Sequence, residues 1–153
     1  MERFELKIPP VLLVVIFAVL MWAASGLLPQ LYIPLSLRIA AFAALAAIGA
    51  WIAIAGVRSF KMAETTVNPT TPNASSSLVT SGIYQRTRNP MYVGLLLLLV
   101  GWGVFLASLY ALALTVGFVV YMNRFQIRPE ERALESLFGE EVLSYQRQVR
   151  RWL

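Results

Sequence analysis

Two short polar clusters border apolar segments, and their residue types could form a ligand pocket. The stretch LVTSGIYQRTRNPMYVG, Leu78 to Gly94, supplies aromatic rings, cationic donors and a chain-stiffening proline where an apolar segment begins. Its cluster consists of Tyr84, Arg88, Asn89, Pro90 and Tyr92. The second cluster follows another apolar segment and consists of Arg124, Arg128, Glu130 and Glu131. Together they predict a pocket with aromatic edges and both charge signs at its rim.

Each of these residues also has a structural interpretation. Arg88 and Arg124 suit anchors whose stems lie in apolar surroundings and whose charges reach the membrane interface, and Tyr92 suits an interfacial aromatic. Glu130 and Glu131 suit the positive end of a helix dipole. The concentration of all of them at one junction favours a binding site over these separate roles.

The composition indicates an integral membrane protein of one domain. The chain has 153 residues, of which 58% are hydrophobic and 14% charged. It contains neither cysteine nor histidine, which excludes disulfides, thiolate nucleophiles and the commonest metal ligands, so we expect no metal. The net charge of +5 comes from basic residues that flank apolar segments, which favours lipid headgroups over a nucleic-acid partner.

Four apolar stretches are candidates for membrane-spanning helices, because roughly 20 apolar residues cross a bilayer. We expect the last two to form a tight antiparallel hairpin that turns at Ala107 and Ser108. The hairpin would bring the two polar clusters together. The first stretch is predicted to be a retained helix and no signal peptide, since MERFELK lacks a net positive charge. The stretches run from about Pro9 to Leu28, Leu35 to Val57, Met91 to Ala107 and Leu109 to Phe125.

The predicted organisation is a single all-helical domain in four parts. Residues 1–57 hold two transmembrane helices, 58–90 a long cytoplasmic loop, 91–125 the hairpin and 126–153 a C-terminal segment. Lysine and arginine concentrate before the first helix, in the loop and after the fourth helix, whereas Arg38 alone lies on the opposite side. This distribution predicts a multi-pass protein with both termini and the site in the cytoplasm, in the inner membrane if the protein is bacterial.

Two further patterns concern packing. Small residues four apart in the second helix, Ala46/Ala50 and Gly49/Ala53, predict a close helix contact. After Pro129, a stripe at three- and four-residue steps predicts an amphipathic helix, only mildly interrupted by Gly139, that lies on the membrane surface or folds over the bundle. Its members are Leu134, Phe138, Val142, Tyr145, Val149 and Trp152.

Two motifs, LVTSGIYQRTRNPMYVG and RPEERALESLFGEEVLSYQRQVRRW, resemble the isoprenylcysteine carboxyl methyltransferase family. This family belongs to a wider group that includes phospholipid N-methyltransferases. The resemblance covers about Leu78 to Trp152, with both motifs in the family's order and spacing. Helices one and two are similar to the family only as generic membrane spans.

The resemblance implies S-adenosylmethionine as methyl donor, with S-adenosylhomocysteine as product. The loop of residues 58–90 would then be the cofactor loop. The acceptor would be a lipophilic small molecule or a prenylated chain reached from the bilayer. The resemblance implies that Arg128 or Arg124 orients this acceptor, with Glu131 as a further catalytic residue. Cofactor-binding positions carried over are Leu78, Val79, Tyr84, Arg88, Asn89, Pro90, Met91, Tyr92 and Glu130.

Asn89 departs from the pattern, because carboxyl methyltransferases of the family carry histidine there. The sequence NPMY is instead similar to the phospholipid branch. A carboxylate acceptor requires no base, whereas an amine must lose a proton, and this chain has no histidine to accept it. LVTSGIY and FGEEVLSY match the carboxyl branch better, which makes a carboxylate the leading acceptor and a phosphatidylethanolamine-type amine the alternative.

Two other classes compete with this interpretation. Membrane sterol reductases share a related pocket, but they are much longer and bind NADPH, for whose 2′-phosphate the chain shows no cluster. A small four-helix carrier or scaffold is the non-enzymatic alternative. Proton-coupled carriers usually place an acidic residue within the membrane, and the four stretches contain none.

Overall fold

The chain folds into an elongated helical bundle. The computed structural model describes residues 5–27, 30–64 and 76–153, and every regular element within them is helical, as predicted. Two elements are not α-helices: η3 is a 3₁₀ helix and η4 is a π-helix. The elements are α1 (Pro10–Ser25), α2 (Leu35–Met62), η3 (Gly82–Gln85), α3 (Pro90–Phe105), α4 (Leu109–Tyr121), η4 (Met122–Ile127), α5 (Arg128–Phe138) and α6 (Glu140–Gln148).

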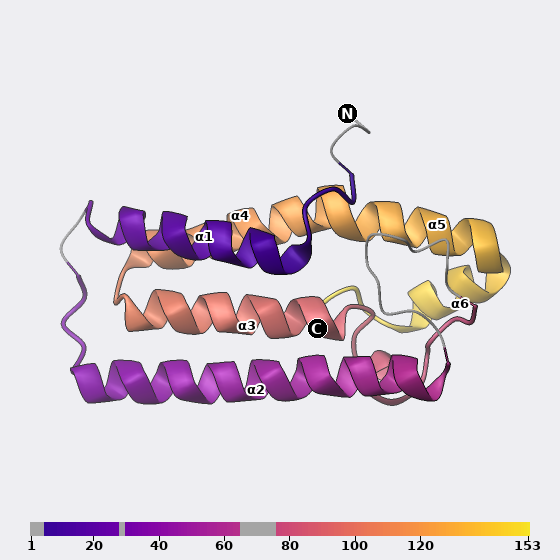
Figure 1. Cartoon of the computed structure of the whole chain (residues 1–153), viewed down its shortest axis with the longest axis horizontal. Helices are drawn as coiled ribbons and strands as arrows, with labels where there is room; N and C mark the ends of the chain where they lie inside the picture. The colour runs from indigo at the N-terminus through magenta and orange to yellow at the C-terminus, as the bar shows by residue number, and fades with distance from the viewer. Residues whose placement is uncertain (1–4, 28–29, 65–75) are drawn as a thin grey trace.

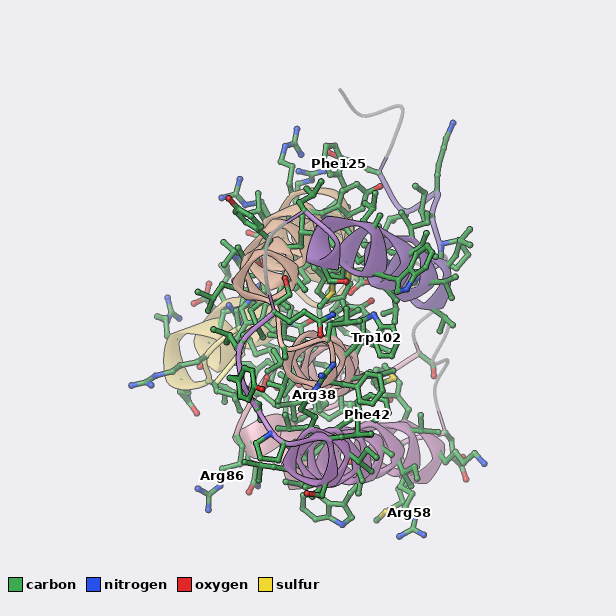
Figure 2. All side chains as sticks on the ribbon, turned by 90° about the vertical axis from the view of Figure 1, so that its left-hand side faces the viewer. Arg38, Phe42, Arg58, Arg86, Trp102 and Phe125 are labelled. Atoms are coloured by element: carbon green, nitrogen blue, oxygen red, sulfur yellow. The ribbon has the colours of Figure 1, made fainter. Side chains whose placement is uncertain are left out.

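Helix α3 is the centre of the bundle. Helix α2 packs along one side of it, and α1 and α4 lie together on the other side (Figure 1). The core between α1, α3 and α4 is built from large apolar side chains, among them Met21, Leu99 and Phe118, which are fully buried. Figure 2 looks along the bundle and shows Phe42 between α2 and α3, and Trp102 between α3 and α1, where its Nε1 donates to the Ala18 carbonyl at 3.1 Å. Burial of this surface holds the helices in place.

Glycine allows α2 and α3 to approach closely. A Cβ atom on Gly94 would lie 2.5 Å from the carbonyl oxygen of Gly49, and one on Gly49 would lie 2.7 Å from that of Gly94. Ala53 also faces Gly94, so the predicted Gly49/Ala53 contact is confirmed. Ala50, from the other predicted pair, is exposed.

The predicted hairpin between the third and fourth apolar stretches is confirmed. Helix α3 ends at Phe105, and α4 begins at Leu109 after Ala107 adopts a positive φ of 50°. The Ser108 hydroxyl accepts a hydrogen bond from Ala111 N at 3.3 Å and caps α4.

The fourth stretch differs from its predicted boundaries. Helix α4 ends at Tyr121, and the π-helix η4 joins it without a break to α5, which begins at Arg128 and has Pro129 in its first turn, as predicted. Proline has no N–H to donate to the carbonyl four residues earlier, that of Phe125. This oxygen accepts instead from the backbone N–H of Leu6, at 3.0 Å. A π-turn is a recognised way to accommodate such a disruption within one helical run.

The single C-terminal helix that we predicted is also wrong. Gly139, with a φ of 55°, separates α5 from α6, and the chain reverses there (Figure 1). After Gln148 the backbone is extended at Val149. The stripe of apolar residues is thus divided between two short helices, and α6 folds back toward the bundle.

Among the described residues, one helix is long and apolar enough to cross a membrane by length and composition, namely α2. Helices α1 and α3 are shorter apolar helices of 16 residues each. Helix α2 extends to Met62, five residues beyond the predicted boundary at Val57, so the predicted loop begins later than residue 58.

Candidate functional site

The two polar clusters meet at one end of the bundle, where η3, the start of α3, η4, α5 and the C-terminal segment come together (Figure 1). The hairpin places the start of α3 beside the end of α4, because the two helices are antiparallel. The continuous run from α4 through η4 then carries Glu130 and Glu131 past the start of α3. Residues about forty positions apart in sequence thereby become neighbours.

The centre of this region is the carboxyl group of Glu130. Tyr92 Oη donates a hydrogen bond to Glu130 Oε1 at 2.5 Å, and Gln126 Nε2 donates to the same oxygen at 2.7 Å. Oε1 therefore accepts both hydrogen bonds that the structure describes, which leaves Oε2 available to accept a hydrogen bond from a ligand. Gln126 is buried, and its place four residues before Glu130 puts both side chains on one side of the helical run.

Burial raises the pKa of Glu130 to about 7, with its neighbour Glu131 adding to the increase. The hydrogen bonds from Tyr92 and Gln126 act in the opposite direction, because they stabilise the ionised form. A carboxyl group with this pKa changes charge near neutral pH. It could therefore bind a cation or exchange a proton under ordinary conditions.

Glu131 joins two arginines from distant parts of the chain. Arg151 forms a two-pronged contact, with Nη2 to Oε2 at 2.6 Å and Nε to Oε1 at 3.1 Å. Arg88 Nη2 lies 3.2 Å from Glu131 Oε1. Two guanidinium groups thus share one carboxylate. Burial lowers the pKa of Arg88, and the charge of Glu131 opposes that shift.

The C-terminal segment closes over the turn before α3. The backbone N–H of Arg88 donates to the Arg150 carbonyl at 2.9 Å. The Arg151 carbonyl accepts from Asn89 Nδ2 at 2.9 Å and from Thr87 Oγ1 at 3.3 Å. Asn89 therefore holds the C-terminal segment in place.

Two tyrosines line the junction between η3 and α6. Tyr145 Oη donates to the carbonyl oxygen of Tyr84 at 2.6 Å, and the Tyr84 ring makes an edge contact with Phe60. Burial raises the pKa of Tyr145 to about 12, against the charge of Arg88, and raises the pKa of Tyr84 further above its ordinary value. Both phenols are therefore neutral hydrogen-bonding groups.

The four remaining predicted cofactor residues take part in packing. Val79 is buried, and Leu78 beside it is partly buried. A Cβ on Gly56 of α2 would lie 3.1 Å from Pro90 Cγ and 3.2 Å from Met91 Cγ, so the start of α3 packs directly on α2.

The structure does not bring the predicted acceptor-orienting arginines into this network. Arg124 Nη1 pairs with Glu5 Oε1 at 2.9 Å, and Arg132 binds the other oxygen of Glu5. Arg128 is exposed and forms no ion pair with a described residue. Arg124 is thus bound by Glu5 of the N-terminal segment. The backbone N–H of Leu6, in the same segment, donates to the carbonyl oxygen of Phe125, next to Arg124.

Several residues of the network were not predicted as site residues. The four-residue spacing of Gln126 and Glu130 was a usable signal. The contact of Trp152 Nε1 with Asn123 Oδ1, at 3.0 Å, depends on the reversal at Gly139 and the π-turn, which the sequence pattern did not reveal. The network residues not predicted are Thr87, Asn123, Gln126, Tyr145, Arg151 and Trp152.

A model of the family described as phospholipid methyltransferase matches residues 37–141. This range contains Tyr92, Gln126, Glu130 and Glu131. An uncharacterized protein of Haemophilus influenzae (strain ATCC 51907 / DSM 11121 / KW20 / Rd) is 44% identical over 63 residues, which is 41% of this chain and 100% of that relative. No solved structure matches the chain.

Proposed function

The chain belongs to the phospholipid methyltransferase family, and we propose that it transfers a methyl group from S-adenosylmethionine to a lipophilic acceptor at a membrane. Family membership implies a methyltransferase associated with membranes. The observation that carries the proposal is the hydrogen bond of 2.5 Å between Tyr92 Oη and Glu130 Oε1, because it joins the two motifs in one site.

The residues around Glu130 fit this donor chemically. S-adenosylmethionine supplies, when bound, a methyl group on a cationic sulfonium. The Glu130 carboxylate, with Oε2 remaining, can pair with the ammonium group of the donor. The faces of Tyr84 and Tyr92 suit a cationic sulfonium and an adenine ring. Tyr92 and Gln126 would hold Glu130 in one orientation for this contact.

A carboxylate is the acceptor that we favour, as in isoprenylcysteine carboxyl methylation. Its ionised oxygen forms a bond to the methyl carbon as the bond between carbon and sulfur breaks, and no proton has to leave. The protein then needs mainly to align the acceptor with the methyl group and to exclude water. The absence of histidine from the chain is compatible with such a reaction.

A phospholipid amine is the second candidate, since the match to the phospholipid methyltransferase family leaves the acceptor open. An amine acceptor has to lose a proton. Glu130, whose pKa is raised to about 7 chiefly by burial, could accept that proton near neutral pH. Glu130 would then serve as a base, which is a different role from pairing with the donor's ammonium group.

We further propose that α1, α2, α3 and the stretch from Leu109 to Phe125, which comprises α4 and the start of η4, span the bilayer, with both termini and the site in the cytoplasm. Many large apolar side chains on the outer faces of these helices are exposed, which suits contact with lipid tails. Examples are Val11, Val15, Trp22, Leu37, Trp51, Ile54, Val116 and Val120. The carrier or scaffold alternative provides no reason for a charged, hydrogen-bonded cluster at one end.

The test uses S-adenosylmethionine with a tritiated methyl group and the purified protein in lipid nanodiscs. A prenylated cysteine carboxylate and phosphatidylethanolamine are offered as separate acceptors. Mild alkali releases tritiated methanol from a methyl ester but leaves an N-methyl group intact, so the products distinguish the two acceptors. Transfer to either acceptor, lost in Glu130→Ala, supports the proposal. Absence of transfer together with absence of donor binding by folded protein would refute it.

A further inference from the structure

Arg88 carries unused hydrogen-bonding capacity inside the site. Its Nη2 pairs with Glu131, but Nε and Nη1 are buried and have no hydrogen-bond partner among the described residues. The side chain is only 13% exposed. Buried donors that remain unpaired destabilise a folded protein, and the cost is larger for a charged group. Such atoms in a binding region indicate a ligand.

The surrounding charge indicates what kind of ligand. Arg88 and Arg151 share the carboxylate of Glu131, and Arg151 makes the closer, two-pronged contact. The three groups therefore carry one excess positive charge. A guanidinium group offers donors and no acceptor, and its geometry matches carboxylate and phosphate oxygens.

We propose that Arg88 recognises an anionic group of the bound ligand, with Nε or Nη1, which lie on different edges of the guanidinium group, donating to a carboxylate or phosphate oxygen beneath the C-terminal segment. The segment contacts the Arg88 turn through the carbonyls of Arg150 and Arg151, so it would close over the bound anion. This inference rests on the proposed function for the source of the anion. The source is either the donor's own carboxylate or an acidic group on the lipophilic acceptor.

Two pairs of ligands test this proposal by comparing each anion with a neutral counterpart. The first pair is S-adenosylhomocysteine and its decarboxylated analogue. The second is dodecyl phosphate and dodecanol, added to nanodiscs of neutral lipid. The measured quantity is the ratio of affinities within a pair, because a general loss of folded protein affects both ligands equally. We expect wild type to prefer the anion of at least one pair by about tenfold or more, as charge-assisted contacts imply.

The decisive variant is Arg88→Gln, and the matched control is Arg86→Gln. Arg86 lies two residues away and is exposed, and its side chain points away from the bundle (Figure 2). We expect Arg88→Gln to remove the preference and Arg86→Gln to retain it. Loss in the first pair identifies the donor's carboxylate, and loss in the second identifies an acidic acceptor.

Glu131→Gln separates anion recognition from a purely structural ion pair. This variant breaks the same ion pair but leaves Arg88 in place, so the preference should be retained or increased. Equal preferences in wild type and Arg88→Gln, or an equal loss in Glu131→Gln, would overturn the inference. If wild type binds neither adenosyl ligand, the proposed function fails, while the dodecyl pair still decides the role of Arg88.

Discussion

Tyr92 and Glu130, 38 residues apart in sequence, are joined by a hydrogen bond of 2.5 Å from the phenol to carboxylate oxygen Oε1. Gln126 donates to the same oxygen, so Glu130 is oriented by two uncharged donors. Burial therefore remains the main influence on this group and keeps its pKa near 7. The carboxyl group is available for a charged ligand because no arginine neutralises it among the described residues.

Replacement of Tyr92 by phenylalanine should weaken S-adenosylhomocysteine binding. The ring remains to fill its buried position, but the hydrogen bond that favours ionised Glu130 is lost. We expect about a fivefold to tenfold loss of affinity at pH 7, corresponding to about 1–1.5 kcal/mol for one hydrogen bond. The pKa of Glu130 should rise further, which titration calorimetry across pH would detect. An unchanged affinity and pH profile would show that Tyr92 does not influence this carboxyl group.

Binding of S-adenosylhomocysteine should increase as the pH rises through about 7, because only ionised Glu130 can pair with the ligand's ammonium group. Below this pKa the affinity should fall by up to about tenfold per pH unit. Glu130→Gln should have a flat profile over the same range. A wild-type profile that is equally flat would contradict the assignment of Glu130.

The ligand-free protein should show the opposite trend in stability. Between pH 4.5 and about 7, folded Glu130 retains a proton that the unfolded chain has released. Its stabilising contribution is therefore complete below pH 4.5 and is lost as the pH rises through 7. The pKa of Glu5 is lowered, chiefly by its hydrogen bond to Arg124, so its own effect lies below this window. Thermal unfolding in detergent should show a decline from pH 5 to 7 that Glu130→Gln reduces.

Gly94→Ala should destabilise the bundle, whereas Gly117→Ala should not. The new Cβ at position 94 would lie 2.5 Å from a backbone oxygen of α2, which cannot move without separating the helices. We expect a loss of about 1–3 kcal/mol. At position 117 the nearest atom is the Phe17 ring at 3.4 Å, an ordinary contact. Alanine there should be neutral or improve helix stability by up to about 1 kcal/mol. Equal melting temperatures for the two variants would exclude close α2–α3 packing.

The absence of cysteine allows the topology to be tested with single introduced thiols. Ser136→Cys in α5 and Tyr32→Cys before α2 are both exposed positions. In intact cells, a membrane-impermeant maleimide should label Tyr32→Cys and should label Ser136→Cys only after permeabilisation. Labelling of both positions without permeabilisation would contradict a cytoplasmic site.

The helical class and the hairpin were predictable because they depend on local pattern and short connections. Long apolar stretches specify helices, and a turn as short as that at Ala107 and Ser108 forces its helices to be antiparallel. The proximity of Tyr92 and Glu130 followed from this topology alone. Close packing of Gly49 was likewise visible as small-residue spacing in the second helix.

The features that the sequence did not predict arise where tertiary contacts override local helix signals. Pro129 lies in the first turn of α5, as predicted, but the sequence does not show that the π-helix η4 joins this helix to α4 or that the Leu6 N–H donates to the Phe125 carbonyl. The apolar periodicity predicts only a mild interruption at Gly139, yet the positive φ of this residue reverses the chain. The apolar periodicity of the C-terminal segment therefore could not predict its contacts with Asn89 and Arg88.

The most direct test of the central claim is the affinity of S-adenosylhomocysteine for the protein in nanodiscs, compared among wild type, Glu130→Gln and Glu135→Gln. Glu135 is exposed on the same helix α5 and is the matched control. We predict micromolar binding to wild type and to Glu135→Gln, and at least about tenfold weaker binding to Glu130→Gln, as loss of a charge-assisted contact implies. Absence of binding to folded wild type, or equal binding to all three proteins, would contradict it.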